Sequence, residues 1–549
     1  MSLTSRFVTH EVENQPVPLR DYNVWTSDTA LREAVEREGA GWAGDHLEEY
    51  GELAGGRLVD VGFTANENKP KLRSFDRYGR RIDEVEFHPA YHELMTEAMR
   101  YGMNGFAWRN ANRAGAHVAR AAVMYIGSQA DAGVGCPMSM TYAAIPALRH
   151  APALAEKWIP KLISTEYDPR SVPMEEKKGC TIGMGMTEKQ GGSDVRANTT
   201  RAVRQADGTY ELVGHKWFFS APMCDAHLVL AQAEGGLSCF LVPRFRPDGS
   251  RNAVEIQRLK DKLGDWSNAS SEVEFQGAFG ELVGEEGRGV ATIIEMVALT
   301  RLDCMTGSAS QMRQALVQAL HHAGQRMAFG KLLIDQPLMR NVLADLALES
   351  EAAIALTLRV ARAIDGASRD AHEAALARIA TAIGKYWICK RTPPFVNEAQ
   401  ECLGGIGYVE ETMMPRLYRQ APLNSIWEGS GNIQCLDVLR ALRKEPETRE
   451  ALFAELAAAG GRDRHYDAAL ARLPCLLEDA ATLEYRSRAV VERTALLLQA
   501  AVLLRAGQEE IAAAFCRSRL AGEHGLAFGT LGPDAPVALL IGRAMATAA

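Results

Sequence analysis

The sequence lacks the features that mark exported and membrane proteins. Its most apolar late stretch, residues 495–504, contains Gln499 and is too short to cross a bilayer of about 30 Å. The first residues contain no apolar segment of the kind found in a signal peptide. We therefore expect a cytoplasmic protein without a membrane segment.

Cysteine pairs and glycine-rich nucleotide motifs are also missing. The ten cysteines are scattered singly, with no Cys-x-x-Cys and no nearby histidine at ligand spacing. This pattern argues against structural zinc and against a disulfide framework, so we expect no metal site and mostly buried, reduced thiols. No Gly-x-Gly-x-x-Gly follows a strand-like run, which argues against a doubly wound dinucleotide-binding sheet.

The length and amino-acid composition are those of an ordinary globular protein. It has 549 residues, of which 47% are hydrophobic and 24% charged, and this length predicts three or four domains. Lys and Arg number 61 and Asp and Glu 69, so the formal net charge is −8. The mild acidity argues against non-specific nucleic-acid binding by the whole chain but permits a local basic face.

The hydrophobic pattern changes along the chain in a way that predicts an α+β fold, with helices and strands in separate domains. Apolar residues recur at helical spacing in the first part, short β-branched runs between turn signals follow, and long alanine-rich helical stretches come last. We expect an N-terminal extension and helical domain (1–179), an antiparallel β domain (180–287), a helical bundle (288–440) and a further helical domain (441–549).

The long helical stretches of the second half contain two recognisable interruptions. Residues 403–432 are rich in turn-forming residues, and Gly460-Gly461 is expected to form a joint within the last domain. A looser tail is expected over residues 522–536.

The first cluster that could bind a ligand lies where the helical domain gives way to strands. In Met184-Gly-Met-Thr-Glu-Lys-Gln-Gly-Gly-Ser-Asp-Val, the hydroxyls of Thr187 and Ser193 lie beside Gly191-Gly192. Backbone amides and hydroxyls there could approach a flat polar ligand closely. A tight interdomain turn is the alternative interpretation.

Two further clusters combine aromatic and polar side chains. In Gly214-His-Lys-Trp-Phe-Phe-Ser, strand alternation prevents all three aromatic residues from facing one core, so at least one faces a ligand or a second core. In Ser425-Ile-Trp-Glu-Gly-Ser-Gly-Asn-Ile-Gln, the low-polarity setting of Glu428 can raise its pKa toward the range of a general base. A solvated loop glutamate is the alternative.

Together with Arg326-Met-Ala-Phe-Gly-Lys-Leu-Leu and Leu403-Gly-Gly-Ile-Gly-Tyr, these clusters resemble, in order and spread, the signature blocks of the acyl-CoA dehydrogenase flavoprotein family. The resemblance runs over almost the whole chain, from Asn14-Gln-Pro-Val-Pro-Leu to the added C-terminal helices. It implies an acyl-CoA dehydrogenase-like α+β fold with an extra C-terminal helical domain, FAD as cofactor, and a homo-oligomer that we expect to be a tetramer.

The resemblance also implies roles for individual residues. Glu428 would remove the α-proton of an acyl-CoA thioester while the β-hydrogen leaves as hydride to flavin N5. In family members whose base lies on an earlier helix the matching residue would be Thr300, which cannot serve. Arg326 and Phe329 would contact the adenosine-pyrophosphate part of an FAD held mainly by a neighbouring subunit. The full implied FAD set is Met184, Met186, Thr187, Gly192, Ser193, Trp217, Phe218, Phe219, Ser220, Arg326, Phe329, Gln336, Ile426, Trp427, Gly429, Ser430, Gly431 and Asn432.

The blocks are most similar to a branch of the family that is linked to DNA binding and to protection against alkylating agents, with at most weak acyl-CoA oxidation. Trp427, with Phe218 and Phe219, would narrow the pocket above the flavin. We therefore expect an FAD protein of the adaptive response to DNA alkylation that binds duplex DNA and has an acyl-CoA or another small molecule as substrate. The alternative is a metabolic acyl-CoA dehydrogenase without a nucleic-acid role.

The implied DNA contacts fall on the last domain, from Arg440 onward, where nearly all basic residues are arginines. Arginine suits phosphate recognition, and we single out Arg440, Arg443 and Lys444. The same region contains enough acidic residues to bring its net charge close to zero. A solvated helical surface with ion pairs along it is therefore the alternative, and DNA binding requires that the arginines gather on one face.

Overall fold

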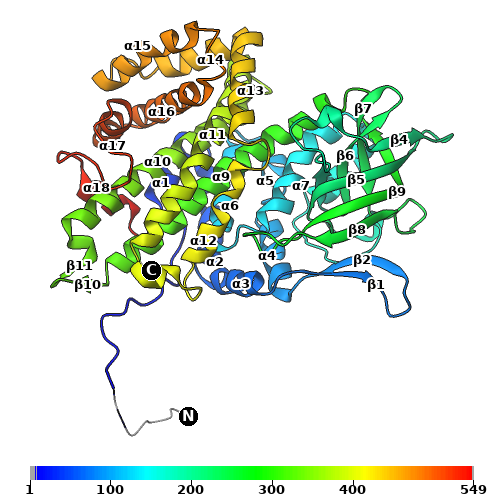
Figure 1. Ribbon diagram of the computed structural model, residues 1–549, viewed down its shortest axis with the longest axis horizontal. Helices are drawn as coiled ribbons and strands as arrows, with labels where there is room; N and C mark the ends of the chain where they lie inside the picture. The colour runs from blue at the N-terminus through cyan, green and yellow to red at the C-terminus, as the bar shows by residue number, and fades with distance from the viewer. Residues whose placement is uncertain (1–6, 8, 547–549) are drawn as a thin grey trace.

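The computed structural model describes residue 7 and residues 9–546. Helices form one side of the molecule and a sheet domain the other, with the N-terminal segment extending from the helical side (Figure 1). The first part contains α1 (Thr29–Arg37), α2 (Gly44–Gly55), α3 (Arg57–Glu67), α4 (Pro89–Arg100), α5 (Phe106–Arg109), α6 (Ala116–Ala130), α7 (Gly135–Leu148) and α8 (Pro152–Leu162).

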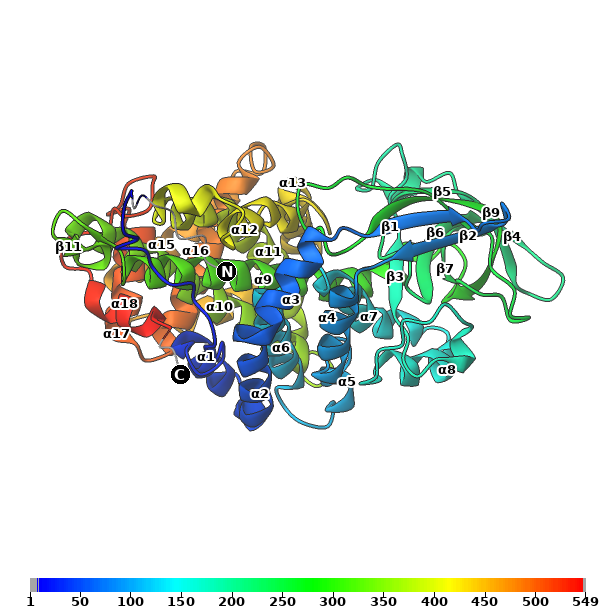
Figure 2. The ribbon, with the colours of Figure 1, turned by 90° about the horizontal axis from the view of Figure 1, so that it is seen from below.

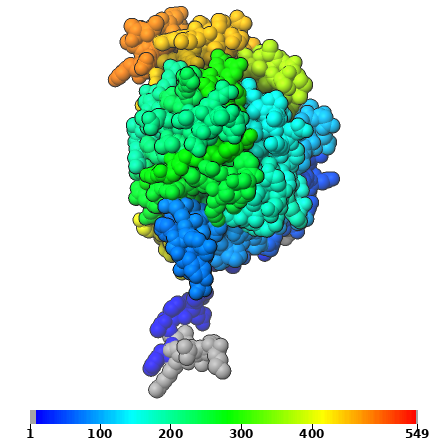
Figure 3. Space-filling view, turned by 90° about the vertical axis from the view of Figure 1, so that its right-hand side faces the viewer, coloured from blue at the N-terminus to red at the C-terminus, as the bar shows by residue number. Residues whose placement is uncertain are grey.

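A β-hairpin interrupts this helical part, where we had expected helices throughout. Strands β1 (Lys71–Phe75) and β2 (Arg81–Glu86) pair antiparallel, and the hairpin lies along the sheet domain (Figures 2 and 3). The turn is closed by the Asp76 carboxylate, which accepts hydrogen bonds from the backbone N–H groups of Tyr78 (2.8 Å) and Arg80 (2.9 Å). Local turn chemistry therefore overrides the helical periodicity on either side.

The middle part is a seven-stranded sheet that closes on itself. Its strands are β3 (Ile182–Gly185), β4 (Arg201–Arg204), β5 (Tyr210–Ser220), β6 (Ala226–Ala233), β7 (Gly236–Pro243), β8 (Val254–Leu259) and β9 (Ser270–Val283). The order is β3-β6-β4-β5-β9-β7, with β8 on β9 and with β7 also paired to β6. Closure leaves few exposed strand edges.

The prediction of a wholly antiparallel sheet is wrong at two pairings. Strand β3 runs parallel to β6, from Ile182 beside Ala226 to Gly185 beside Val229, and β4 meets β6 in parallel at one position. A parallel pair needs a long connection, and the chain between β3 and β6 passes through β4 and β5 before it returns. The alternation of side chains along one strand does not reveal which distant strand it pairs with, or in which direction.

The second half is helical, as predicted. It contains α9 (Gly289–Ala323), α10 (Pro337–Gly366), α11 (Ala371–Glu401), α12 (Met414–Gln420), α13 (Gly431–Lys444), α14 (Pro446–Ala457), α15 (Arg464–Glu478), α16 (Ser487–Arg505), α17 (Glu509–Phe515) and α18 (Val537–Ala544), with the small hairpin β10 (Met327–Ala328) and β11 (Lys331–Leu332).

Two boundaries within this half lie where the sequence predicts them, and one does not. The turn-rich segment 403–432 contains α12 and two short 3₁₀ turns. Gly460-Gly461 separates α14 from α15, and residues 522–536 contain no helix or strand, both as predicted. The division that we placed between residues 440 and 441 falls inside α13, which continues unbroken across it.

The last helices share one hydrophobic core with the bundle, because buried side chains of α16 and α17 belong to the same cluster as those of α9 and α10. Buried ion pairs reinforce this contact. Arg519, only 6% exposed, pairs with Asp345 and with Glu349 of α10, and Arg391 of α11 pairs with Glu349 from the other side at 2.9 Å. The added helices are therefore fixed to the bundle, and no flexible linker separates them.

Nine of the ten cysteines are buried, Cys475 is exposed, and all ten are free thiols. In the part of the chain that is described, no cluster of three or more His, Cys, Asp or Glu could hold a metal ion. Within the same residues, no helix has the length and apolarity that crossing a membrane requires.

We predict that Arg519→Met destabilises the protein by about 3–5 kcal/mol at pH 7, because it leaves Asp345 and Glu349 in the core with too little compensating charge. Burial would raise the pKa of Glu349, but Arg391 and Arg519 hold it at about 2, below the ordinary 4.5. This contribution to stability is present above pH 4.5 and is lost as the pH falls toward 2.

The measurement is the thermal unfolding midpoint by circular dichroism at pH 7 and at steps between pH 4.5 and 2.5. Arg517→Met is the matched control, because Arg517 forms ion pairs with Glu523 and Asp534 at the surface, where such pairs contribute about 1 kcal/mol or less. Equal midpoints for the two variants at pH 7 would contradict the prediction.

Candidate functional site

The predicted base lies in a strained turn between α12 and α13. Glu428 has φ +57°, a left-handed conformation that costs a residue with a side chain about 1 kcal/mol or more, and Gly429 follows with φ +93°. The surrounding structure must therefore hold the turn in this shape.

Three side chains hold the turn by its carbonyl oxygens. The ammonium of Lys385, on α11, donates to the carbonyl of Trp427 at 2.6 Å and to that of Gly429. Gln434 Nε2, on α13, donates to the carbonyls of Glu428 (3.0 Å) and Gly429 (2.9 Å), and Arg301 Nε, on α9, donates to that of Glu428 at 3.1 Å. Three helices of the bundle thus fix one turn.

The carboxyl group of Glu428 points to α9. Thr300 Oγ1 donates to Glu428 Oε2 at 2.7 Å; the same hydroxyl lies 3.1 Å from the carbonyl of Val297, but its single proton favours the shorter contact. Burial raises the pKa of Glu428 above its ordinary value, while the Thr300 hydrogen bond and the charges of Lys385 and Arg301 oppose the rise. A raised pKa suits a general base, and the burial contradicts the interpretation as a solvated loop glutamate.

The neighbouring indole is also fixed. Trp427 Nε1 donates to Asn424 Oδ1 at 2.9 Å, and Asn424 Nδ2 donates to Ser308 Oγ of α9 at 3.2 Å. Ile426, before it, is 62% exposed and is free to contact a ligand.

The glycine-rich loop after β3 is held by a buried ion pair. Lys216 Nζ lies 2.8 Å from Glu188 Oε1, and neither side chain is exposed. Glu188 also accepts hydrogen bonds from the backbone N–H groups of Thr199 (2.7 Å) and Thr200 (3.1 Å). Burial would raise the pKa of Glu188, but the Lys216 ammonium and these donors hold it well below its usual range.

This anchorage leaves the ligand-facing groups of the loop free. The carbonyl of Thr187 accepts from the N–H of Trp217 at 2.8 Å, which fixes the loop beside β5. Among the described residues, the hydroxyls of Thr187 and Ser193 have no protein partner. A Cβ at Gly192 would come within 2.3 Å of Thr187 Oγ1, so a larger residue there would displace the Thr187 side chain.

The aromatic run on β5 divides between two sides of the strand, as its alternation predicts. Phe218 is 53% exposed, and the ammonium of Lys260 lies 3.6 Å from the centre of the Trp217 ring. The expectation for Phe219 is wrong: it is 2% exposed and stacks on His227 at 3.8 Å inside the sheet. Its side chain therefore neither lines a flavin site nor narrows a pocket. Met184 is also nearly buried, at 9% exposure.

Three predicted FAD residues lie elsewhere. Arg326, Phe329 and Gln336 belong to the β10–β11 hairpin or flank it, at the end of the molecule opposite the sheet domain (Figure 1). Phe329 is 99% exposed with φ +50°, and Gln336 Nε2 donates to the carbonyl of Ala328 at 2.9 Å. One chain therefore cannot bring them to the ligand that Trp217 would contact.

The N-terminal segment binds the same hairpin. Asn14 pairs with the backbone of Met327, its Oδ1 accepting from the N–H at 2.7 Å and its Nδ2 donating to the carbonyl at 2.9 Å. The guanidinium of Arg326 donates to the carbonyl of Asn14. The extension at residue 14 thus orients Arg326.

The arginines from Arg440 onward are of three kinds. In the described structure, one set is exposed without an ion pair from α14 onward, and it comprises Arg449, Arg462, Arg464, Arg472, Arg488 and Arg493. Arg440, Arg443 and Lys444 are exposed at the end of α13. Others are engaged in ion pairs with acidic residues, and these are Arg486, Arg505, Arg517, Arg519 and Arg543. The ion-pair interpretation therefore holds for part of the set, and the exposed group remains available to a partner.

Comparison with known proteins identifies the architecture. Family models for the acyl-CoA dehydrogenase middle domain and C-terminal domain match residues 183–278 and 287–443, and the model for the N-terminal domain of the adaptive response protein AidB matches residues 14–169. AidB of Escherichia coli (strain K12), itself named as an acyl-CoA dehydrogenase, is 51% identical over 93% of this chain and 94% of its own. The chain belongs to the acyl-CoA dehydrogenase family. The resemblance and the fold class predicted from the sequence are confirmed.

Solved structures agree with this membership. The acyl-CoA dehydrogenase ACDH-11 of Caenorhabditis elegans, in complex with C11-CoA, has a TM-score of 0.85 at 26% identity and covers 94% of this chain and 95% of its own. A structure titled Bd2924 apo-form has a TM-score of 0.82 at 29% identity, covering 93% and 100%. Acyl-CoA dehydrogenases are FAD-dependent oxidoreductases, so FAD is the cofactor that this site has to accommodate.

The residues present fit a flavin. The loop after β3 offers free hydroxyls and a glycine where a larger residue would displace the Thr187 side chain, and β5 offers the indole of Trp217 beside them. Such a surface can hold a flat ring that accepts and donates hydrogen bonds. In this dehydrogenase-family chain the residues able to hold the ring are thus Met186, Thr187, Ser193 and Trp217.

Sequence reasoning missed the residues that position Glu428. Thr300 was considered only as a base, whereas here it is a hydrogen-bond donor. Lys385 is 1% exposed and lies in an otherwise apolar helical stretch between Ile379 and Cys389. A lone charge on a buried helical face is the signal that could have revealed it.

We predict that Thr300→Val raises the pKa of Glu428 further, because it removes a hydrogen bond to the ionised carboxylate worth about 1.5–3 kcal/mol. The pH dependence of the bound flavin's visible absorbance measures this pKa, and its transition should move to higher pH. Thr306→Val is the control, since the Thr306 hydroxyl bonds the carbonyl of Leu302 on the same helix. A transition that is unchanged in Thr300→Val, or moved equally in both variants, would refute the role of Thr300.

Proposed function

We propose that the chain binds FAD between the Glu428 turn and the loop after β3, and that Glu428 is the base in α,β-dehydrogenation of an acyl-CoA thioester. The observation that carries this proposal is the Glu428 carboxyl group, which is partly buried, raised in pKa and fixed by Thr300. The bound FAD supplies the acceptor for the hydride that leaves the β-carbon. The solved relative whose title names C11-CoA supports an acyl-CoA as the substrate class.

The protein's own contribution is to hold and receive a proton. Because Thr300 occupies Oε2 of Glu428, Oε1 is the oxygen open to the α-proton. The hydrogen bonds from Lys385, Gln434 and Arg301 fix the turn, so the carboxylate does not have to be ordered when the substrate arrives. The partial burial of the carboxylate reduces its hydration, which raises its pKa and so its basicity.

The FAD site is proposed to be completed by a second copy of the chain in a homotetramer. Arg326 and Phe329 lie at the end of the molecule away from the sheet domain, so they can reach only a neighbour's cofactor (Figure 1). Phe329 is a fully exposed aromatic residue in a left-handed conformation, which is unfavourable unless a partner covers it.

We expect Glu428→Gln to slow anaerobic bleaching of the flavin by acyl-CoA esters by about 100-fold or more, because the amide cannot take the proton. Stopped-flow absorbance with a series of chain lengths provides the measurement. Glu447→Gln, an exposed glutamate on α14, should react like the unaltered protein. Bleaching of Glu428→Gln at the unaltered rate would show that another group is the base.

For the physiological role, we propose an AidB-like function in the response to DNA alkylation, with binding of duplex DNA through Arg440, Arg443 and Lys444. Two observations support it over a purely metabolic dehydrogenase. The similarity to E. coli AidB extends over 93% of this chain, whereas the dehydrogenase domain models end at residue 443. The end of α13 also brings three exposed cations close together, none of which has an ion-pair partner among the described residues.

We expect Arg440→Ala/Arg443→Ala to weaken duplex binding and to reduce the slope of log affinity against log salt by up to about 0.9 per lost phosphate contact. Fluorescence anisotropy with labelled duplex between 50 and 300 mM NaCl provides both quantities. The matched double variant Arg486→Ala/Arg517→Ala removes two arginines that already have acidic partners and should bind like the unaltered protein. If both pairs weaken binding equally, the exposed group has no special role.

A further inference from the structure

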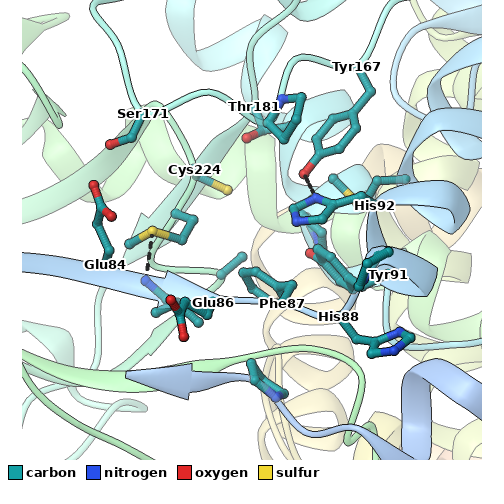
Figure 4. A pocket seen from close by; sticks show the side chains of 18 of the residues that line it. Glu84, Glu86, Phe87, His88, Tyr91, His92, Tyr167, Ser171, Thr181 and Cys224 are labelled. Atoms are coloured by element: carbon teal, nitrogen blue, oxygen red, sulfur yellow. Dashed lines mark hydrogen bonds between the residues drawn. The ribbon is translucent and has the colours of Figure 1, made fainter. Parts of the chain in front are cut away.

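A cavity of about 920 Å³ lies at the junction of the β1–β2 hairpin, α4, the start of β3 and the loop from β5 to β6 (Figure 4). None of the residues implied in FAD binding lines it, although Ala221, which does, directly follows Ser220. It adjoins the start of β3, whereas the predicted flavin loop follows the end of that strand. The cavity is therefore separate from the Glu428 site.

Flat side chains form part of its wall. The rings of Phe87 and Tyr91 stack at 4.0 Å with an angle of 14°, and His92 Nδ1 lies 3.0 Å from the hydroxyl of Tyr167 (Figure 4). Trp266 adds an indole whose face carries the ammonium of Lys69 at 4.0 Å. Such walls favour a planar ring.

Tyr91 brings an unsatisfied hydroxyl to this wall. The residue is 4% exposed, and within the described chain its O–H has no hydrogen-bond partner. Burial raises the pKa of Tyr91, so the group remains a neutral O–H donor at physiological pH. Because Tyr91 lines the cavity and its hydroxyl is not fully enclosed by protein, this O–H can donate to an acceptor on a ligand there.

Among the described residues, two cations of the cavity wall have no ion pair, the exposed Lys71 and the less exposed Arg244. Four of the five lining carboxylates have a cation of their own, in the pairs Glu84–Arg251, Glu86–Arg73, Asp168–Arg170 and Asp225–Lys177. Among the described residues, no carboxylate lies within ion-pair distance of Arg244, and the carboxylates of Asp225 and Glu84 act on it only from farther away. It donates only to Ser171 Oγ (3.0 Å) and to the carbonyl of Met223 (3.3 Å).

The guanidinium of Arg244 is therefore equipped for an anion. Burial lowers its pKa, so the group has lost much of its water. Five N–H donors are available on an arginine, and the two protein contacts leave donors free for a carboxylate or phosphate. A desolvated, unpaired guanidinium and an unsatisfied tyrosine hydroxyl are independent observations within one cavity.

We propose that this cavity is a second small-molecule site, which binds a planar aromatic anion of about the size of a nucleoside monophosphate. The ring lies against Phe87 and Tyr91 and accepts a hydrogen bond from the Tyr91 hydroxyl, and the phosphate or carboxylate pairs with Arg244. The volume falls in the range of about 300–1,000 Å³ that small-molecule sites occupy. This proposal is independent of the role of Glu428.

Isothermal titration calorimetry of the FAD-saturated full-length protein with AMP tests the site, because the bound cofactor keeps AMP out of the flavin site. Adenosine and inorganic phosphate are titrated separately. We expect AMP to bind, and each part alone to bind at least about tenfold more weakly. No AMP binding at millimolar concentration, or adenosine binding as tightly as AMP, would overturn the proposal.

Two variants place AMP in this cavity. Arg244→Met should weaken AMP binding by about tenfold or more, whereas Arg246→Met, whose guanidinium bonds the carbonyl of Gly277, should not change it. Tyr91→Phe should weaken it by about fivefold, the equivalent of one hydrogen bond. If Arg244→Met does not fold, Arg244→Lys is the alternative variant. It keeps the positive charge but loses the paired N–H donors of the guanidinium, and it should bind AMP a few-fold more weakly. Affinity unchanged in the Arg244 and Tyr91 variants, or lost instead in Arg440→Ala/Arg443→Ala, would overturn the assignment.

Discussion

The Lys385 ammonium, buried in the helical bundle, is the constraint on which the arrangement around Glu428 depends. A buried cation needs partners, and here backbone carbonyls provide them. The two carbonyls, of the residues on either side of Glu428, can face the same ammonium only if the chain turns sharply between them, and Glu428 accordingly adopts a left-handed conformation. The position of the carboxyl group thus follows from the need to satisfy a lysine on a neighbouring helix.

In the sheet domain, too, a buried charge with a partner inside the protein fixes one border of the site. The Glu188–Lys216 pair is fully buried and anchors the glycine-rich loop from beneath, so that the exposed atoms of the loop remain unoccupied. Both borders of the proposed flavin site are therefore fixed by buried charges whose partners belong to the protein. This is costly in desolvation, but it produces surfaces that do not need to rearrange around a ligand.

The sequence allowed most of the architecture to be predicted, because long helices and short alternating strands have different periods. Three features escaped prediction for physical reasons. The hairpin at 71–86 depends on one aspartate that closes a turn, and the parallel pairing of β3 depends on a return of the chain that no local pattern encodes. Phe219 was assigned to the flavin through the family resemblance, and the alternation of the strand alone does not say which of the three aromatic side chains enters the core.

The candidate site was predictable in its motifs and not in its supporting contacts. Glu428 and Thr187 were recognised from their local sequence, whereas Lys385, Gln434 and Thr300 act through distances that only the packed bundle defines. The cavity lined by Arg244 and Tyr91 had no sequence signal at all. Its walls come from several segments that lie between residues 67 and 266, each of ordinary composition.

Helix α13 begins three residues after Glu428 and ends at Lys444. A helix of 14 residues is about 21 Å long and does not change its length, so it acts as a rigid rod between the turn and the exposed cations. Gln434, on this rod, bonds the carbonyls of the turn itself. Any partner that tilts the far end of α13 therefore moves the hydrogen bonds that hold Glu428, and the two ends of the helix form one mechanical unit.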